Sequence, residues 1–202
     1  MRLGTTRAAL LMAMVSLAPA ARAEPPDPAV LQIERLCDVW IDTMKHATEL
    51  GVRGRYEKLK PTTDQLFDYP DMVRFIVGSE NWAKTPGPDQ QKLIAAFARY
   101  TAAVWADRLD GYGGEKFTIE PKTTVRGQDR VVMTKLVGKD ETNAIAFRMR
   151  LVEGSWKIVD VYYKNTMSQL ATEHDGDSPT VQAGGVPALE RAMQAKAEKL
   201  LK

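Results

Sequence analysis

Residues 144–163 read AIAFRMRLVEGSWKIVDVYY, and this stretch decides the class of fold. Its first half alternates large apolar residues with small or basic ones, the pattern of a strand with one apolar face. Glu153-Gly154-Ser155 is typical of a tight turn. The segment from Trp156 to Tyr163 is apolar on both faces, so we expect a buried strand at the centre of a sheet.

Two further strands are predicted before this hairpin. Phe117–Ile119 alternates with polar neighbours, and Arg130–Val137 is rich in valine and threonine, which favour strands. Thr123–Val125 is a candidate for an additional edge strand. Because short turns join these segments, the sequence predicts an antiparallel meander of four or five strands.

Helices are predicted on both sides of the strand region, because apolar residues recur there every three or four positions. The polar stretches 51–61 and 172–185 are expected to be loops, the second of them mobile. The expected helices cover residues 28–50, two or three short segments within 62–85, residues 87–109, and the chain from Val186 onward.

The order of the elements, helices first, then strands, then a helix, indicates an α+β fold. We expect the helices to pack on one face of a curved antiparallel sheet, which can form a cone with an apolar interior. An ordinary packed core and a ligand cavity would both explain the large apolar side chains on these faces. Composition alone leaves both interpretations open.

The first 23 residues have the features of a signal peptide. Arg2 and Arg7 precede an apolar run, and Ala21-Arg22-Ala23 matches the small-x-small pattern of a cleavage site. The run is shorter than the about 20 apolar residues that span a bilayer. We therefore expect cleavage after about Ala23 and a single mature domain, residues 24–202, in the periplasm; an uncleaved anchor is the alternative.

Removal of this segment changes the charge of the protein. The full sequence has 28 basic and 26 acidic side chains, and without Arg2, Arg7 and Arg22 the count becomes 25 against 26. A nearly neutral chain without a clustered basic patch is not typical of nucleic-acid binding or of a polybasic membrane tether. We therefore expect no nucleic-acid partner.

Residues that could form a catalytic or metal centre are few. His46 is expected within a helix and His174 within a polar segment, so neither is positioned as the base of a nucleophilic triad. The acidic residues around His174 miss the spacing of a calcium-binding loop. The lone Cys37 is expected to be a small apolar helix residue. The sequence predicts no catalytic residue, no metal and no cofactor.

Asp160 is the most notable acid, because it lies within the apolar stretch Ile158-Val159-Asp160-Val161. A buried carboxylate without a partner is costly, so we expect one. A hydrogen bond or ion pair to a neighbouring helix or strand is favoured. The alternatives are a proton-handling group in a cavity and a polar contact to the head of a ligand.

Several stretches have the order and spacing of a known family. They are Phe67-Asp68, Met72-Val73-Arg74-Phe75-Ile76-Val77-Gly78 with Trp82, Pro88-Asp89-Gln90-Gln91, Phe97, Tyr112 and Trp156-Lys157-Ile158-Val159-Asp160-Val161. Together they resemble the MlaC family of periplasmic phospholipid-shuttle proteins, from about Val30 to Leu200. Residues 165–172 and Gly184-Gly185 resemble its hopanoid-associated HpnM branch, whereas the acidic segment 173–177 departs from the typical pattern.

The resemblance implies an NTF2-like fold whose sheet and helices enclose a pocket for acyl chains or a polycyclic hydrocarbon. It implies a carrier of phospholipid or hopanoid between the inner and outer membranes. Its partners would be an inner-membrane ABC-type transport complex and an outer-membrane lipoprotein or porin complex, and we expect a monomer.

The helix and strand faces that should line this pocket are rich in aromatic, branched and methionine side chains. The predicted lipid-binding residues are Phe67, Met72, Phe75, Ile76, Phe97, Tyr100, Val104, Phe117, Ile119, Met133, Ile145, Phe147, Met149, Val159, Val161 and Tyr163.

Two other functions stay open at this point. One is a lipid-free adaptor that bridges membrane complexes, and the other is an enzyme that uses the same cavity with Asp160 as its base. Carriage itself requires no catalytic residue, because the lipid passes from one apolar environment to another.

Overall fold

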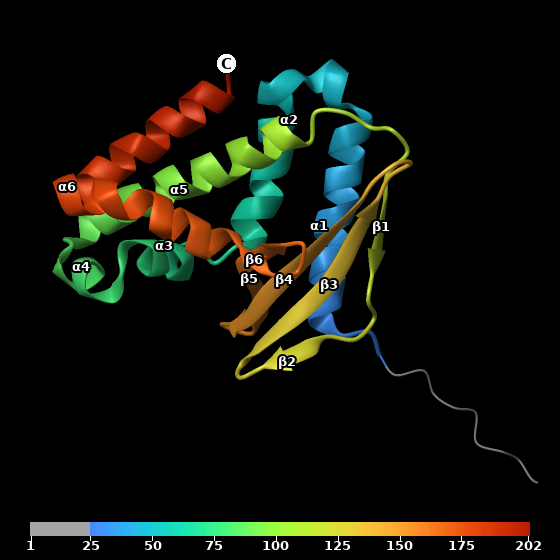
Figure 1. Ribbon diagram of the computed structural model, residues 1–202, viewed down its shortest axis with the longest axis horizontal. Helices are drawn as coiled ribbons and strands as arrows, with labels where there is room; N and C mark the ends of the chain where they lie inside the picture. The colour runs from blue at the N-terminus through green and yellow to red at the C-terminus, as the bar shows by residue number, and fades with distance from the viewer. Residues whose placement is uncertain (1–24) are drawn as a thin grey trace, which may run out of the picture.

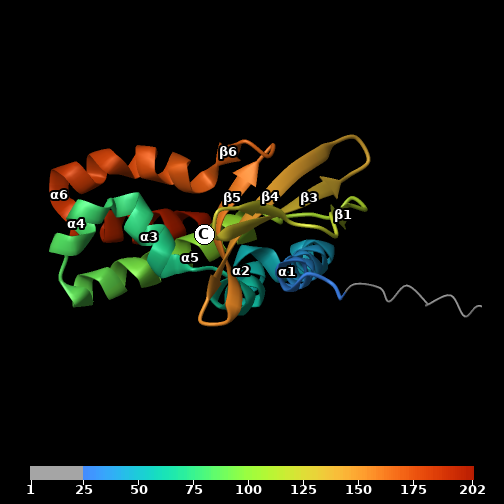
Figure 2. The same cartoon turned by 90° about the horizontal axis from the view of Figure 1, so that it is seen from below.

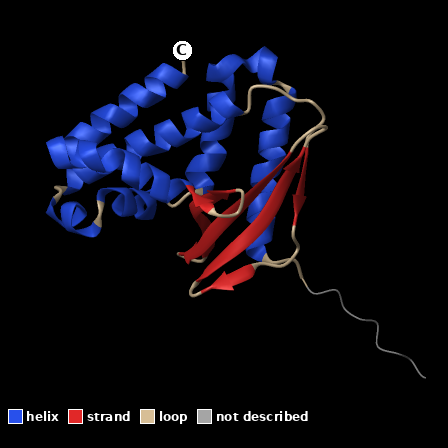
Figure 3. Cartoon of the chain, in the orientation of Figure 1, coloured by secondary structure: helices blue, strands red, loops and turns tan. Residues whose placement is uncertain are grey.

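The chain combines a curved antiparallel sheet with helices that pack on it and extend beyond it (Figure 1). The computed structural model describes residues 25–202, and the predicted signal peptide lies outside the described residues. Figure 3 shows α1 against one face of the sheet and the remaining helices gathered beside it, which confirms the predicted α+β fold. In chain order the elements are α1 (Pro28–Lys45), α2 (Ala47–Leu66), α3 (Tyr69–Val77), α4 (Ser79–Lys84), α5 (Gly87–Arg108), β1 (Lys116–Ile119), β2 (Thr124–Arg126), β3 (Asp129–Val137), β4 (Thr142–Val152), β5 (Ser155–Tyr163), β6 (Met167–Ser168) and α6 (Gln169–Leu200).

The sheet is an antiparallel meander with the strand order β1-β3-β4-β5-β6, and β2 also pairs with β3. Val132 pairs with Phe147, and Phe147 pairs with Val161, so these three side chains share the face that meets the helices. Between β4 and β5 the register shifts, which makes Val159 an extra residue in a β-bulge. The predicted hairpin, its turn and the candidate edge strand near residue 124 are confirmed.

The prediction that β5 is central in the sheet is wrong. Its neighbours are β4 on one side and the two-residue β6 on the other. Both of its faces are apolar because other segments cover it. The backbone N–H of Asp68 donates to the carbonyl of Ile158 at 2.9 Å, so the connection between α2 and α3 closes the edge that β6 leaves free.

The two segments expected to be loops are helical. Residues 51–61 belong to α2 and residues 172–185 belong to α6. Each helix buries only a few side chains, such as Leu59 in α2 and Val181 in α6, so the apolar periodicity is too sparse to indicate a helix. The predicted breaks are nevertheless real, because the backbone leaves helical geometry at Gly51 and at Gly185.

Gly185 divides α6 into two halves that run out along α5 and return (Figure 2). The first half lies near α3, where His174 contacts the carbonyl of Ile76, and the second half brings Leu189 and Met193 into the core. The centre of the main core is Trp40 of α1. The centroid of its ring lies 4.0 Å from that of Trp105 and 5.9 Å from that of Phe147. Aromatic packing thus joins α1, α5 and the sheet.

Gly185 should be essential for the turn within α6. Its φ of 64° and ψ of −165° lie in a region that is essentially restricted to glycine. Gly185→Ala should lower the free energy of unfolding by about 1–3 kcal/mol in urea titrations. Gly176→Ala is the control, because this helical position has nothing within 4 Å of an added Cβ. It should be neutral or stabilising by up to about 1 kcal/mol, and equal effects of the two substitutions would contradict this account.

Candidate functional site

A small cavity lies where α3, α5, β5 and the start of α6 meet. Its volume is about 10 Å³, close to the roughly 10–15 Å³ that one water molecule requires. In this conformation the cavity is therefore closed to a ligand of lipid size. Its lining residues are Phe67, Met72, Phe97, Thr101, Val161, Gln169, Leu170 and Glu173. Four of them, Phe67, Met72, Phe97 and Val161, belong to the predicted lipid-binding set.

Regular secondary structure directs these side chains into the cavity. Phe97 and Thr101 are one helical turn apart on α5, and Gln169 and Glu173 have the same spacing on α6. The aromatic side of the cavity continues behind Phe97, because the ring of Tyr69 meets it edge-on at 6.0 Å. One side of the cavity is thus a packed aromatic wall.

The other predicted residues lie elsewhere in the fold. Ile76, Val104, Ile145, Phe147 and Met149 are buried, and Tyr100 and Tyr163 are partly buried against the main core. Met133 and Ile119 share a shallow depression near Pro121. Phe75 is 52% exposed and meets the ring of His174 edge-on. The assignment of these side chains to a lipid remains a prediction.

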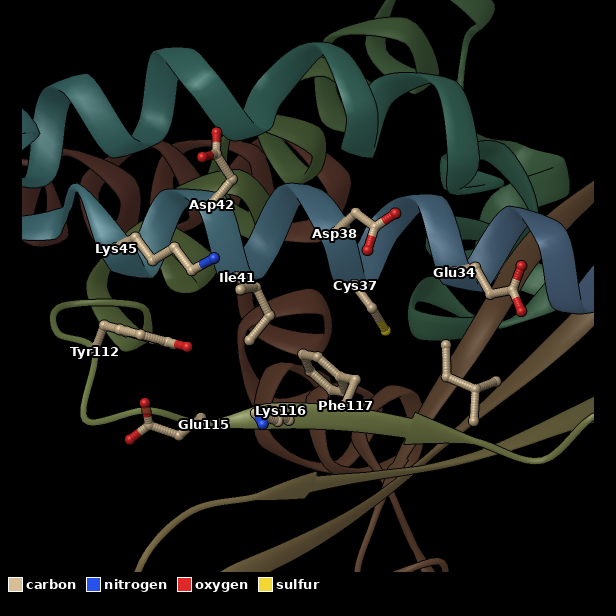
Figure 4. Close-up of a pocket in the computed structure, with 11 residues that line it drawn as sticks. Glu34, Cys37, Asp38, Ile41, Asp42, Lys45, Tyr112, Glu115, Lys116 and Phe117 are labelled. Carbon is tan, nitrogen blue, oxygen red and sulfur yellow. The ribbon is translucent and has the colours of Figure 1, made fainter.

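Phe117 and Ile119 lie in a groove between α1 and β1, with a volume of about 640 Å³ (Figure 4). In Figure 4, Cys37 and Ile41 point from α1 toward the strand, whereas Asp42 points away from it, toward α2. Burial raises the pKa of the Cys37 thiol, and the nearby carboxylates add to this effect. Cys37 lies in α1, which confirms the predicted helix position, and it is buried.

The polar side of the cavity comes from α6 and was missed by the sequence analysis. Burial raises the pKa of Glu173, and the neighbouring charge of Asp177 raises it further. The hydroxyl of Tyr100 donates to Glu173 Oε1 at 3.4 Å, and Lys196 pairs with Asp177 at 2.8 Å. The four-residue spacing of Gln169, Glu173 and Asp177 could have revealed this helical face.

A second, open groove lies outside the cavity, between α3, the outer face of β4 and β5, and the start of α6. Its volume is about 680 Å³. Leu170 lines both the groove and the cavity, so it separates the two. We call this the outer groove; it is lined by Asp71, Arg74, Phe75, Ser79, Arg148, Arg150, Val159, Asp160, Tyr162, Ser168, Leu170 and Ala171.

An ion network beneath the outer groove connects α3 to the sheet. Asp129 is 1% exposed and accepts hydrogen bonds from Arg148 Nε at 2.5 Å and Arg150 Nε at 2.7 Å. Burial opposes ionisation of Asp129, but the two guanidinium groups outweigh it and lower its pKa. Arg150 Nη1 also donates to Asp71 of α3 at 2.6 Å. Its bonds to Asp129 raise the pKa of Arg150.

Asp160 has the structural role that the sequence favoured. Its Oδ1 accepts from the backbone N–H groups of Val161 and Leu170, and its Oδ2 accepts from the Ser168 hydroxyl at 2.7 Å. The same hydroxyl accepts from the N–H of Ala171 and caps α6. The carboxylate therefore satisfies the N–H of Leu170 in the first turn of this helix, where a negative charge is also favourable.

Together these observations define an α+β protein whose candidate site is an apolar cavity between its helices and its sheet. A curved sheet and its helices enclose an apolar cavity, and only a few polar groups line one side of it. Among residues 25–202, no group of three or more His, Cys, Asp or Glu side chains could hold a metal ion. None of the helices in the described part of the chain combines the length and apolar character needed to cross a bilayer.

The chain belongs to the MlaC family, described as MlaC protein, which it matches over residues 34–195. Its fold is similar to a solved structure, the phospholipid-binding protein from Ralstonia solanacearum in complex with a phospholipid. The TM-score is 0.74 at 16% sequence identity, over 87% of this chain and 100% of the other. No curated protein matches the sequence. Membership of the HpnM branch stays a prediction.

Loss of the Asp160 carboxylate should destabilise the start of α6. Asp160→Ala leaves the buried N–H of Leu170 without its acceptor, which should cost about 1–3 kcal/mol of unfolding free energy. Amide hydrogen exchange should also speed up at Leu170 and Ala171. Asp160→Asn retains one oxygen acceptor and should lose less stability. Unchanged stability of Asp160→Ala would show that these bonds contribute nothing.

The buried Glu173 should make stability depend on pH. Because its folded-state pKa is raised, the folded protein binds this proton more tightly than the unfolded chain does. Its ionisation therefore lowers stability as the pH rises above the unfolded value near 4.5. In urea titrations Glu173→Gln should be more stable than the wild type at pH 8, and the difference should shrink toward pH 4.5. Glu57→Gln, at an exposed position of α2, should show neither effect.

Proposed function

We propose that this protein is a periplasmic carrier that binds a phospholipid or hopanoid between its helices and its sheet. The observation that carries the proposal is the apolar cavity, to which Met72, Phe97 and Val161 contribute from three different elements. Membership of the MlaC family supports it. The same fold in a protein that was solved in complex with a phospholipid supports it as well.

Loading of a lipid requires the walls of the cavity to separate, since about 10 Å³ holds no acyl chain. The walls belong to α3, α5, β5 and α6, which are separate elements that can shift against one another. Within residues 25–202, the polar contacts that hold α3 to β5 and the sheet are chiefly the Asp68–Ile158 hydrogen bond and the Asp71–Arg150 ion pair. Relative movement of α3, α6 and the sheet is therefore the economical route to a larger pocket.

The free energy of transferring acyl chains is compatible with a carrier. Each methylene exposed to water costs about 0.8 kcal/mol, so about 30 methylenes of a diacyl lipid cost on the order of 20 kcal/mol. The protein does not have to supply this amount as net affinity, because the chains leave one apolar environment for another. The direction of transport would then be set by the donor and acceptor complexes.

The cellular setting of the proposal rests on the sequence. The features of residues 1–23 support export and cleavage, which would leave a single mature domain of residues 24–202. The family resemblance supports an inner-membrane ABC-type complex and an outer-membrane complex as partners. The HpnM-like features at residues 165–172 support hopanoid as an alternative cargo to phospholipid.

A bulky residue in the cavity should block lipid loading. Val161→Trp fills the space between β5 and the helices, so purified protein should lose its bound lipid in native mass spectrometry. The control Val125→Trp adds the same side chain at a position of β2 that is 71% exposed, and it should retain the lipid. Circular dichroism and thermal unfolding establish that both variants are folded.

Full lipid occupancy of folded Val161→Trp would refute the cavity as the binding site. Lipid extraction of the wild-type protein decides the wider question, because the reproducible absence of a bound lipid would support a lipid-free adaptor instead. An enzyme with Asp160 as base has no comparable support, since both carboxylate oxygens accept hydrogen bonds from the β5–α6 region.

A further inference from the structure

The outer groove and the cavity have the same walls. Helix α3 contributes Arg74 to the groove and Met72 to the cavity, while β5 contributes Asp160 to the groove and Val161 to the cavity. Leu170, which is 8% exposed, lies between the two spaces. An amphiphile with its chains in the cavity can therefore place its polar end in the outer groove by passing Leu170.

Three guanidinium groups line the outer groove, those of Arg74, Arg148 and Arg150. Guanidinium is the side-chain group that best fits phosphate, because its planar donors bind two oxygens at once. Arg148 donates a hydrogen bond to Asp129 through Nε, and its side chain also interacts with that of Tyr162. Its two terminal nitrogens carry further N–H groups that a ligand can use.

Four carboxylates lie near these arginines, and three of them are already bound to other groups; one of the three, Asp68, accepts from the N–H of Asp71 at the start of α3. The oxygens of Asp160 are occupied at the start of α6, and Asp129 is buried beneath Arg148 and Arg150. Asp71 is the accessible one, and it pairs with both Arg74 and Arg150. Its carboxylate occupies the position of an oxyanion between two guanidinium groups.

Opening of the cavity would free guanidinium donors in the outer groove for an anionic ligand. Within the described residues, the Asp71–Arg150 contact is the ion pair that joins α3 to the sheet. Separation of α3 from the sheet lengthens it and frees donors of Arg150 as the lipid enters. The rim of the groove also carries the exposed ring of Phe75, an apolar surface that suits an amphiphile better than a free inorganic anion.

We infer that the outer groove is a phosphate-binding site, in which Arg148, with Arg74 and Arg150, holds the phosphodiester of a lipid whose chains occupy the cavity. The inference rests on the proposed carrier function and adds the group on the cargo that the protein recognises. Asp71 takes the place of the phosphate in the empty, closed protein and gives it up when the lipid is loaded.

The test compares two lipids with identical acyl chains, phosphatidylglycerol and diacylglycerol, offered to delipidated protein from mixed micelles. The wild type should prefer phosphatidylglycerol by about tenfold or more, the effect expected of charge-assisted hydrogen bonds. Arg148→Gln should reduce this preference to less than about threefold. Arg126→Gln, at an exposed position of β2, is the matched control and should keep the full preference.

Equal binding of the two lipids by the wild type, or an undiminished preference in Arg148→Gln, would overturn the phosphate site while leaving the carrier function intact. Binding of neither lipid would instead refute the function as a phospholipid carrier. Arg148 neutralises the buried Asp129, so its variant could fail to fold. Arg74→Gln then serves as the second variant, because Arg74 is exposed, pairs only with Asp71 on its own helix within residues 25–202, and should lower the preference about two- to threefold.

Inorganic phosphate carries the same kind of anionic group as the lipid but no acyl chains. A further experiment therefore distinguishes a lipid phosphodiester from free phosphate as the ligand of the groove. Inorganic phosphate at millimolar concentration should not displace phosphatidylglycerol from the wild type. Displacement that depends on Arg148, without any preference between the two lipids, would overturn the lipid assignment in favour of a free anion.

Discussion

The hydrogen bonds that Asp160 accepts from the beginning of α6 are the contacts on which the arrangement of the site depends. They satisfy the N–H of Leu170 and the hydroxyl of Ser168, and so they determine where the helix starts and how it is rotated. From that starting point the helical repeat brings Gln169 and Glu173 to the cavity and leaves Leu170 between the cavity and the outer groove. A carboxylate in an apolar strand is thus used to attach a helix.

The closed cavity and the ion network occur together in the same conformation of the protein. The apolar walls meet with room for about one water molecule, which avoids an empty apolar void in the absence of a ligand. The same closure lets Arg150 of the sheet reach both Asp129 and Asp71. A ligand that separates the walls must replace these contacts, which couples the apolar and the charged parts of the site. The carrier function and the phosphate site proposed above use this coupling.

Much of the fold could be predicted because its elements have strong local signals. The alternation in residues 144–151, the turn at Gly154 and the stripe on α5 are each visible in the sequence, and the strands and α5 follow them closely. The helices at residues 51–61 and 172–185 could not be predicted in this way, because their stability comes from a few contacts with distant segments. Arg55, for example, is buried and donates to the carbonyl of Ala106 at 2.6 Å.

For the candidate site the same distinction applies to individual residues. The sequence by itself determined that Phe67, Met72, Phe97 and Val161 lie on apolar faces and that Asp160 needs a partner, since both follow from the cost of exposing apolar groups or burying an unpaired charge. Only the tertiary structure decided that these four meet at one closed cavity, that Glu173 forms its polar side, and that Arg148 and Arg150 converge beneath α3. The physical reason is that these contacts join elements far apart in the chain, whose relative placement depends on the packing of the whole core and not on local periodicity.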